Sequence, residues 1–416
     1  MVNILQEVSE GKLRKGLPKR LTLNGETKTH ESYLIPIEYL FYNDLNGRIA
    51  TYIQEYNDEN GSDELSNLFE VDREKYNEKL SNFVKASGND DMSSFNRTKE
   101  DIHLKGQQIP GVVLADGRII DGNRRFTAIR DLYKETGDLK FAYFEAVVLD
   151  TPQNDNQWKS IKTLELYLQF NVDEKRDYNR IDYLVSFYRD VIETKIFDEK
   201  TYIYASGIKK HQFNKDKRIV EIMLDYLEWR NKPKAFYILK NEKLDGPIEE
   251  IAGKTSKMSK EEWNAKKNVI YTYMTFNQQG DRTRDIRELL ISAVEESPLF
   301  LSFQENIEKP SVMVAVQEIV EEIDKPVQTT EESVERFEKK KKIQTHIENV
   351  YKKAKFEDIA EKNSNKALDS LEIVLNQIKK IDKNSISSLS NSIKKSISNT
   401  IEKIQNELEG IINETK

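Results

Sequence analysis

The stretch from Ile109 to Asp150 constrains the fold more than any other part of the chain, because its apolar period changes within a few residues. The run IPGVVLA is typical of a buried strand, and an Asp-Gly turn leads from it into a second short strand, RIID. Gly122 ends this strand, and from Asn123 the apolar residues recur at helical spacing. Gly137 ends the helix, and FAYFEAVVL is typical of another strand. The predicted order is strand, hairpin, strand, glycine turn, helix and strand.

The turn between the second strand and the helix has the features of an anion site. A helix N-terminus presents unpaired backbone N–H groups and the positive end of the helix dipole. Arg124 and Arg125 stand in the first helical turn, where their charge opposes that dipole. A bound phosphate would reverse the local field and make both arginines favourable there. The open alternative is a turn whose arginines are solvated or paired with Asp121 and nearby carboxylates.

The segment IPGVVLADGRIIDGNRRFTAIRDL resembles the core of the ParB/sulfiredoxin superfamily, in which a G-x-R-R or G-x-H-R motif begins a helix. Four residues fall on that motif, namely Gly122, Asn123, Arg124 and Arg125. In IPIEYLFYNDLNGRI, Arg48 matches the arginine of the family's Asn/Arg box. The resemblance covers residues 30–235 apart from an insertion at 54–105, and it implies a nucleoside-triphosphate site.

A second segment, LELYLQFNVDEKRDYNRIDYL, is similar to the second ParB box. Its nearest matches to the family's residues are Glu165, Gln169, Asn171 and Arg176. The resemblance implies that this box and the Asp121–Arg125 turn bind CTP or ATP with Mg²⁺, with Gln169 and Asn171 as metal ligands. Glu165 is the candidate catalytic carboxylate for a slow CTPase or ATPase. Sulfiredoxin chemistry is excluded because it needs a cysteine.

Downstream of this box, the sequence predicts a helix, a turn at Gly207 and a longer helix, which is the order of a helix-turn-helix. Basic and amide side chains follow the turn, namely Lys209, Lys210, Gln212, Asn214, Lys215, Lys217 and Arg218. At the start of a recognition helix such side chains reach phosphates and base edges in the major groove of DNA. The open alternative is a solvated basic helix face.

The C-terminal part contains no glycine between Asp281 and Glu409, and the polar, proline-marked segment EEIDKPVQTTEES is the best linker candidate. Beyond it, Ile and Leu recur between Leu368 and Ile411, mostly three or four residues apart. This stripe is too narrow to fold alone, so we expect a coiled coil or helical hairpin that forms a homodimer. The alternative is an appendage that folds back on the body or binds another protein.

Composition limits the classes of function. The absence of cysteine excludes disulfides, thiolate metal sites and cysteine nucleophiles, and four histidines are too few for a His-rich metal cluster. A net charge of −7 argues against a surface that is basic throughout, but it permits a local basic patch. No apolar run approaches ~20 residues and the N-terminus does not resemble a signal peptide, so we expect a soluble cytoplasmic protein without a membrane partner.

These patterns together predict an α+β chain that binds DNA in a nucleotide-dependent way, in plasmid maintenance or phage defence. The predicted parts are a small mixed-sheet ParB/sulfiredoxin-like domain (1–155) with a surface insertion of one or two helices (54–105), a mainly helical helix-turn-helix domain (156–300), a linker (301–330) and a helical dimerisation or partner-binding region (331–416). Two alternatives stay open. One is a ParB-like nuclease or phosphoryl-transfer enzyme, and the other is a non-catalytic interaction module of a larger complex.

Overall fold

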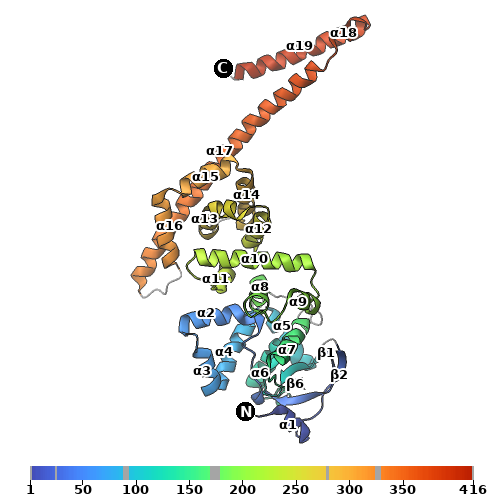
Figure 1. Cartoon of the computed structure of the whole chain (residues 1–416), viewed down its shortest axis with the longest axis vertical. Coiled ribbons are helices and arrows are strands. Elements are labelled where there is room, and N and C mark those ends of the chain that lie inside the picture. The colour runs from blue at the N-terminus through green and yellow to red at the C-terminus, as the bar shows by residue number, and fades with distance from the viewer. Residues whose placement is uncertain are drawn as a thin grey trace. The chain divides into compact units, whose positions relative to one another are not determined.

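A computed structural model describes residues 2–23, 26–87, 93–168, 179–277, 281–323 and 329–414. The chain divides into two compact units, Met1–Glu348 and Asn349–Lys416, and the division falls inside the long helix α17 (Thr330–Lys379). Two small sheets lie in the N-terminal part of the first unit, and the described chain that follows them is helical (Figure 1). The fold is therefore mixed α+β with a helical C-terminal region, as the sequence predicts.

The main sheet has four strands in the order β3-β6-β4-β5. Their bounds are Ser32–Pro36 for β3, Gly111–Leu114 for β4, Ile119–Asp121 for β5 and Tyr143–Leu149 for β6. The central strand β6 runs antiparallel to β3 and parallel to β4, and β4 runs antiparallel to β5, so the sheet is mixed. A separate antiparallel pair is formed by β1 (Lys19–Leu23) and β2 (Glu26–His30).

The element order predicted for residues 109–150 is confirmed. Gly122 follows β5 in the left-handed conformation with φ of 96°, and α6 begins at the next residue (Asn123–Thr136). A Cβ atom at position 122 would lie 3.0 Å from the Phe144 ring and 3.2 Å from the Arg125 guanidinium. Glycine is therefore required at this turn by its backbone conformation and by its neighbours.

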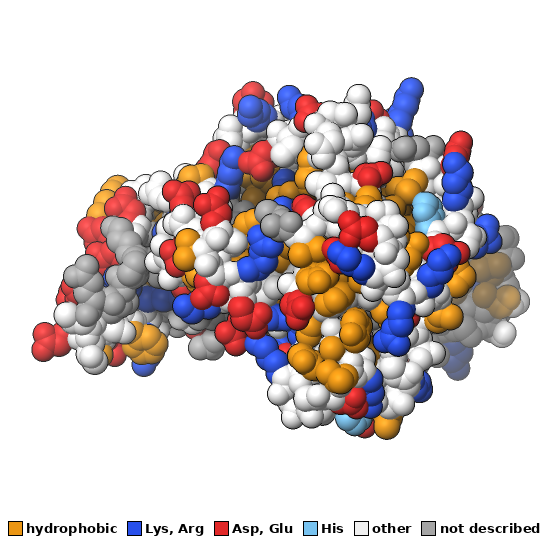
Figure 2. Space-filling view, turned by 90° about the horizontal axis from the view of Figure 1, so that it is seen from below, with side chains coloured by type: hydrophobic (Ala, Val, Ile, Leu, Met, Phe, Trp, Pro, Cys, Tyr) orange, Lys and Arg blue, Asp and Glu red, His pale blue; other side chains and the backbone are white. Residues whose placement is uncertain are grey.

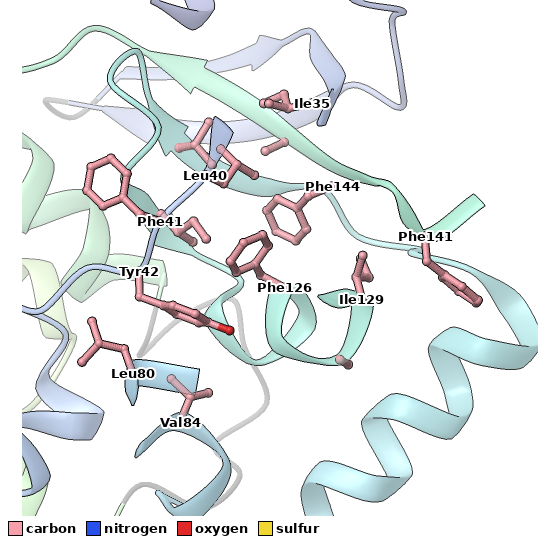
Figure 3. Packing of buried hydrophobic residues seen from close by; sticks show 14 of the residues in the cluster. Ile35, Leu40, Phe41, Tyr42, Leu80, Val84, Phe126, Ile129, Phe141 and Phe144 are labelled. Atoms are coloured by element: carbon pink, nitrogen blue, oxygen red, sulfur yellow. The ribbon is translucent and has the colours of Figure 1, made fainter. Parts of the chain in front are cut away.

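The core of this sheet domain is built around the aromatic ring of Phe126 on α6. This ring meets the rings of Tyr42 and Phe144 edge to face, with centroids 5.1 and 5.5 Å apart (Figure 3). Leu80 and Val84 belong to the same buried cluster and come from the segment predicted as an insertion. The core is thus shared between the sheet, α6 and that segment.

The segment predicted as a surface insertion of one or two helices differs from that prediction. It holds four helices, α2 (Ala50–Asn60), α3 (Glu64–Val71), α4 (Arg73–Ala86) and α5 (Ser93–Lys105). Its few apolar side chains are the reason, because they recur at helical spacing and enter the core that contains Phe126. Arg130 of α6 also binds it, donating to both carboxylate oxygens of Glu74 at 2.8 and 2.9 Å.

The remaining helices of the first unit pack mostly on one another, and α10 contacts both α8 and α12 (Figure 1). Their bounds are Ile4–Ser9 for α1, Asp155–Tyr167 for α7, Arg180–Phe187 for α8, Glu199–Ser206 for α9, Lys210–Trp229 for α10, Phe236–Asn241 for α11, Asp245–Thr255 for α12, Lys260–Phe276 for α13 and Arg282–Glu295 for α14. Short 3₁₀ helices span Ile37–Tyr39, Gly47–Ile49 and Leu139–Phe141, and a π-helical turn spans Tyr188–Glu193.

The segment predicted as a linker, 301–330, also differs. It contains most of α15 (Pro298–Ile307) and all of α16 (Pro310–Glu322), which bury Phe303, Ile307 and Val316. Pro298 and Pro310 are each the first residue of their helix, where the missing N–H would have had no partner. Pro326, the proline of the linker candidate EEIDKPVQTTEES, lies outside the described residues.

The second unit contains the end of α17, the short helix α18 (Lys383–Ser387) and α19 (Asn391–Glu414). No residue of α19 is buried. Among the described helices of the whole chain, none has the combination of length and apolar character that crossing a bilayer requires.

Replacing Phe126 with alanine tests the core assignment. Phe126 is fully buried between two aromatic rings, so Phe126→Ala leaves a cavity and is expected to lower the free energy of unfolding by about 3–5 kcal/mol. Denaturant unfolding followed by circular dichroism measures the change. Leu139→Ala is the control, because Leu139 is 72% exposed and should change little. Equal effects of the two substitutions would contradict the assignment.

Candidate functional site

The turn at Gly122 is held by a buried carboxylate with two cationic partners. Asp121, the last residue of β5, accepts from Lys19 Nζ at 2.7 Å and from the Arg125 guanidinium at 3.1 Å. The exposed fractions of the Asp121, Lys19 and Arg125 side chains are 12%, 8% and 17%. Lys19 also donates to the Pro110 carbonyl at 2.7 Å. The cluster carries one more positive than negative charge and joins β1, β5 and α6.

The balance of burial and charge at Asp121 favours its ionised form. Burial alone would raise the pKa of Asp121, but the charges of Arg125 and Lys19, with the hydrogen bond from Lys19, outweigh burial and hold this pKa below its ordinary value. The carboxylate thus fixes both cations beside the glycine turn.

The first turn of α6 has an excess of donors. Gly122 gives α6 no side-chain cap, and no acidic residue stands in the first turn. Arg124 extends toward α5 and donates to Ser94 Oγ at 3.3 Å. Among the described residues, the buried donor Arg125 Nε has no hydrogen-bond partner, and neither has the buried acceptor Asn123 Oδ1. The helix N-terminus, two guanidinium groups and the Lys19 ammonium therefore form a positive region suited to an anion.

The alternative interpretation of the turn, in which the two arginines are solvated or paired with carboxylates, holds for Arg125. Arg125 pairs with Asp121, as that alternative states, and this pair removes part of its charge from the site. Neither Arg124 nor Arg125 is exposed, because both side chains are partly buried against other elements. The turn is therefore a cationic site whose two arginine side chains are partly buried and whose Arg125 is held by Asp121.

Glu165 of the second ParB-like box lies on a helix that contacts the segment containing Arg48. Glu165 on α7 is buried and pairs with Lys162 at 2.8 Å, and Lys162 also donates to the Leu45 carbonyl at 3.2 Å. Leu45 precedes Arg48 by three residues and Lys162 precedes the second box by two, so the helix that leads into this box contacts the segment that carries Arg48. Arg48 lies near Asp182 of α8: burial raises the pKa of Asp182, and the charge of Arg48 opposes this rise in part.

The other predicted residues of the second box, Gln169, Asn171 and Arg176, lie outside the described residues. The prediction that Gln169 and Asn171 ligate a metal ion therefore stays a prediction. Within the described ranges, no group of three or more His, Asp or Glu side chains is arranged to hold a metal ion.

Sequence reasoning missed Lys19 and Lys162. Both lysines are buried in ion pairs, Lys19 with a residue 102 positions away and Lys162 with a neighbour on its own helix. The Asn-Gly pair at 24–25, between two runs with strand character, is the signal that could have identified the strand of Lys19. For Lys162, the spacing of three residues to Glu165 was such a signal.

The predicted helix, glycine turn and longer helix are present in the central region. Gly207 ends α9 in the left-handed conformation, and α10 begins at Lys210. One face of α10 is buried through Phe213, Ile219 and Met223. Its opposite face leaves most of the predicted basic residues exposed near the N-terminal end of the helix.

Some of the predicted DNA-binding side chains already form ion pairs or hydrogen bonds within the chain, and others do not. Lys210 pairs with Glu199 at 3.1 Å and Lys215 with Glu249 at 2.9 Å. Gln212 and Arg218 also have partners within the chain. Gln212 donates to the buried Asp216, while Arg218 pairs with Glu221 and donates to Thr255. Lys209, Asn214 and Lys217 are exposed and make no side-chain contact of this kind within the described chain. These three are the best placed for an external ligand.

Charge is mixed elsewhere on the surface. On the face seen in Figure 2, acidic and basic side chains alternate and a group of hydrophobic side chains lies near the centre. That face has no continuous basic area, which agrees with the negative net charge of the chain.

Two comparisons of the sequence with known proteins found no match. No family model matches the chain, and no curated protein matches its sequence. The likeness to the ParB/sulfiredoxin superfamily therefore rests on the residues of the chain itself.

Replacing Asp121 with asparagine tests the charge cluster. Asp121→Asn leaves two largely buried cations without their carboxylate, so we expect a loss of about 3–5 kcal/mol in the free energy of unfolding at neutral pH. The stabilisation by Asp121 is present above its unfolded pKa of about 4 and is lost as the pH falls through its depressed folded pKa. The difference between the two proteins should therefore shrink below about pH 4.

The measurement is denaturant unfolding of both proteins from neutral to acid pH. Asp101→Asn is the control, because Asp101 pairs with Lys105 on an exposed helix face and should change stability little. A difference between wild type and Asp121→Asn that stays constant with pH would contradict the assigned role.

Proposed function

We propose that this chain is a ParB-like, nucleotide-dependent DNA-binding protein that binds CTP or ATP with Mg²⁺. The observation that carries the proposal is the cationic turn: Arg124 and Arg125 stand in the first turn of α6, which has no side-chain cap, and Lys19 binds the adjacent Asp121. The mixed sheet and the glycine turn agree with the family resemblance in the sequence. A role in plasmid maintenance or phage defence belongs to the same proposal.

The phosphates of the nucleotide would lie at the first turn of α6. Backbone N–H groups there need an acceptor, and Arg124 and Arg125 supply further donors to phosphate oxygens. A triphosphate would compete with Asp121 for Arg125, whose Nε has no partner within the described chain. Because Mg²⁺ in such sites is held largely by phosphates and water, the ion would arrive with the nucleotide.

Nucleotide binding would affect the packing of the helical region through the buried carboxylate of Asp182. Asp182 on α8 is buried and accepts from Thr51 at 2.5 Å and from Lys240 of α11 at 2.7 Å. Burial raises the pKa of Asp182, even though Lys240, Thr51 and Arg48 act to lower it. A nucleotide that drew Arg48 toward its phosphates would remove one of these compensating charges. The packing of α2, α8 and α11 would then respond to the bound state.

DNA contact would be made by the start of α10. Lys209 and Lys217 are exposed cations without an acidic partner in the described chain, and Asn214 is exposed between them. In helix-turn-helix proteins the N-terminal residues of the second helix enter the major groove. The lysines would contact phosphates, and Asn214 could reach base edges.

The nucleotide site is tested by calorimetry with CTP, ATP, GTP and UTP in the presence of Mg²⁺. We expect one of CTP and ATP to bind, and Arg124→Ala to weaken binding about tenfold or more, since a hydrogen bond to a charged group is worth about 1.5–3 kcal/mol. The double variant Arg124→Ala/Arg125→Ala should weaken it further. Arg97→Ala is the matched control, because Arg97 is exposed on α5.

Circular dichroism and thermal unfolding of each variant separate lost binding from lost folding. If no nucleotide binds the folded wild type, or if the folded double variant binds as tightly as the wild type, the proposed nucleotide site is wrong.

The DNA-binding face is tested by the salt dependence of binding to a random-sequence duplex. Removing one lysine–phosphate interaction should reduce the slope of log K against log salt by about 0.9. We therefore expect Lys209→Ala/Lys217→Ala to bind more weakly with a slope lower by about 2. Lys257→Ala, an exposed lysine after α12, is the control and should keep the wild-type slope. An unchanged slope in the double variant would exclude α10 as the contact surface.

A further inference from the structure

Helix α19 carries an apolar stripe that the described chain leaves largely uncovered. The stripe consists of Ile393, Ile397, Ile401, Ile404, Leu408, Ile411 and Ile412. At 3.6 residues per turn, these side chains fall within an arc of about 100° on one face of the helix. Ile401 is 49% exposed and Ile412 50% exposed, and no residue of the 24-residue helix is buried. A helix of this length gains most of its stability from packing such a face against a partner.

The apolar residues of the stripe are arranged symmetrically about the middle of the helix. Counted outward from the peptide bond between residues 402 and 403, three pairs of apolar residues stand at equal distances on the two sides. The pairs are Ile401 with Ile404, Ile397 with Leu408, and Ile393 with Ile412. A second copy of α19 that runs antiparallel about this point would place an apolar side chain opposite each of these six. Such a self-complementary surface suits a two-fold symmetric pair.

The charges of α19 favour the antiparallel direction. Lys394 and Lys395 lie near its N-terminus, while Glu407, Glu409 and Glu414 lie near its C-terminus. This distribution opposes the dipole of the helix, so it is unfavourable in an isolated helix. An antiparallel copy brings an acidic end beside each basic end. A parallel copy would bring like charges together at both ends.

We propose that α19 pairs with α19 of a second copy of the chain, antiparallel, about a two-fold axis at residues 402–403. The protein is then a homodimer through this helix. This inference is independent of nucleotide and DNA binding, since it uses neither the Gly122 turn nor α10.

The first test is the mass of the full chain in solution at micromolar concentration, measured by light scattering. We expect twice the 48.6 kDa of one chain. Ile401→Lys/Ile404→Lys should give the single-chain mass, because it places four charges around the axis of the pair. Ile373→Lys is the matched control, since Ile373 is a 62% exposed isoleucine of α17 and should leave the dimer intact. Circular dichroism of each variant confirms that the helices are kept.

The second test measures the direction of the pair. Because the chain has no cysteine, Asn391→Cys and Asn413→Cys each give one site for a spin label. In the antiparallel dimer, two labels at the same position should lie about 35 Å apart for position 391 and about 32 Å apart for position 413, at 1.5 Å per residue. A mixture of the two labelled variants should add a short distance of roughly 10 Å, close to the spacing of packed helices.

Four results would overturn the proposal. They are a monomeric wild type, a dimer that persists in Ile401→Lys/Ile404→Lys, short distances between labels at the same position, and a monomer whose α19 stripe is covered by the Leu368–Ile378 face of α17. A failure of nucleotide or DNA binding would leave these measurements unchanged.

Discussion

The ion pairs of Asp121 are the interaction on which the arrangement of the N-terminal domain depends. A single carboxylate at the end of β5 holds Lys19 from β1 and Arg125 from α6, and so connects the two-stranded sheet, the main sheet and the helix. Because burying charges is unfavourable unless they are paired, the three groups can be buried only together. Gly122 makes the geometry possible, since its left-handed backbone turns the chain from strand to helix within one residue.

Other buried charges connect elements in the same way. Arg130 joins α6 to α4 through Glu74, Asp182 joins α8 to α2 and α11, and Asp216 accepts from Arg180 and Tyr183 of α8. Such pairs stabilise a fold weakly, because desolvation offsets most of their attraction. They do fix which elements meet, since a change of packing would leave a buried charge alone. The proposed link between nucleotide and helical region uses this property at Asp182.

The predictions from sequence were most accurate where the pattern is local. The order of elements in residues 109–150 follows from two turn glycines and a change of apolar period, and the structure has that order. The predictions for 54–105 and 301–330 differ from the structure, because a polar and charged composition does not exclude a buried helix face. In both segments a few apolar residues at helical spacing suffice to bury one face, and Pro310 begins a helix.

The sequence by itself determined the glycine turn with its two arginines, the glycine between α9 and α10, and the apolar stripe of α19, because each is a pattern within one continuous segment of the chain. Only the tertiary structure decided that Lys19 joins the turn, that Arg125 pairs with Asp121, and that Gln212 and Arg218 are used in packing. Lys19 comes from a strand 102 positions away in the sequence, and nothing in the local pattern points to that contact. Asp121 with Arg125 and Gln212 with Asp216 stand four residues apart, a spacing that permits a pair, but only the packing of the surrounding elements decides that these pairs form and are buried.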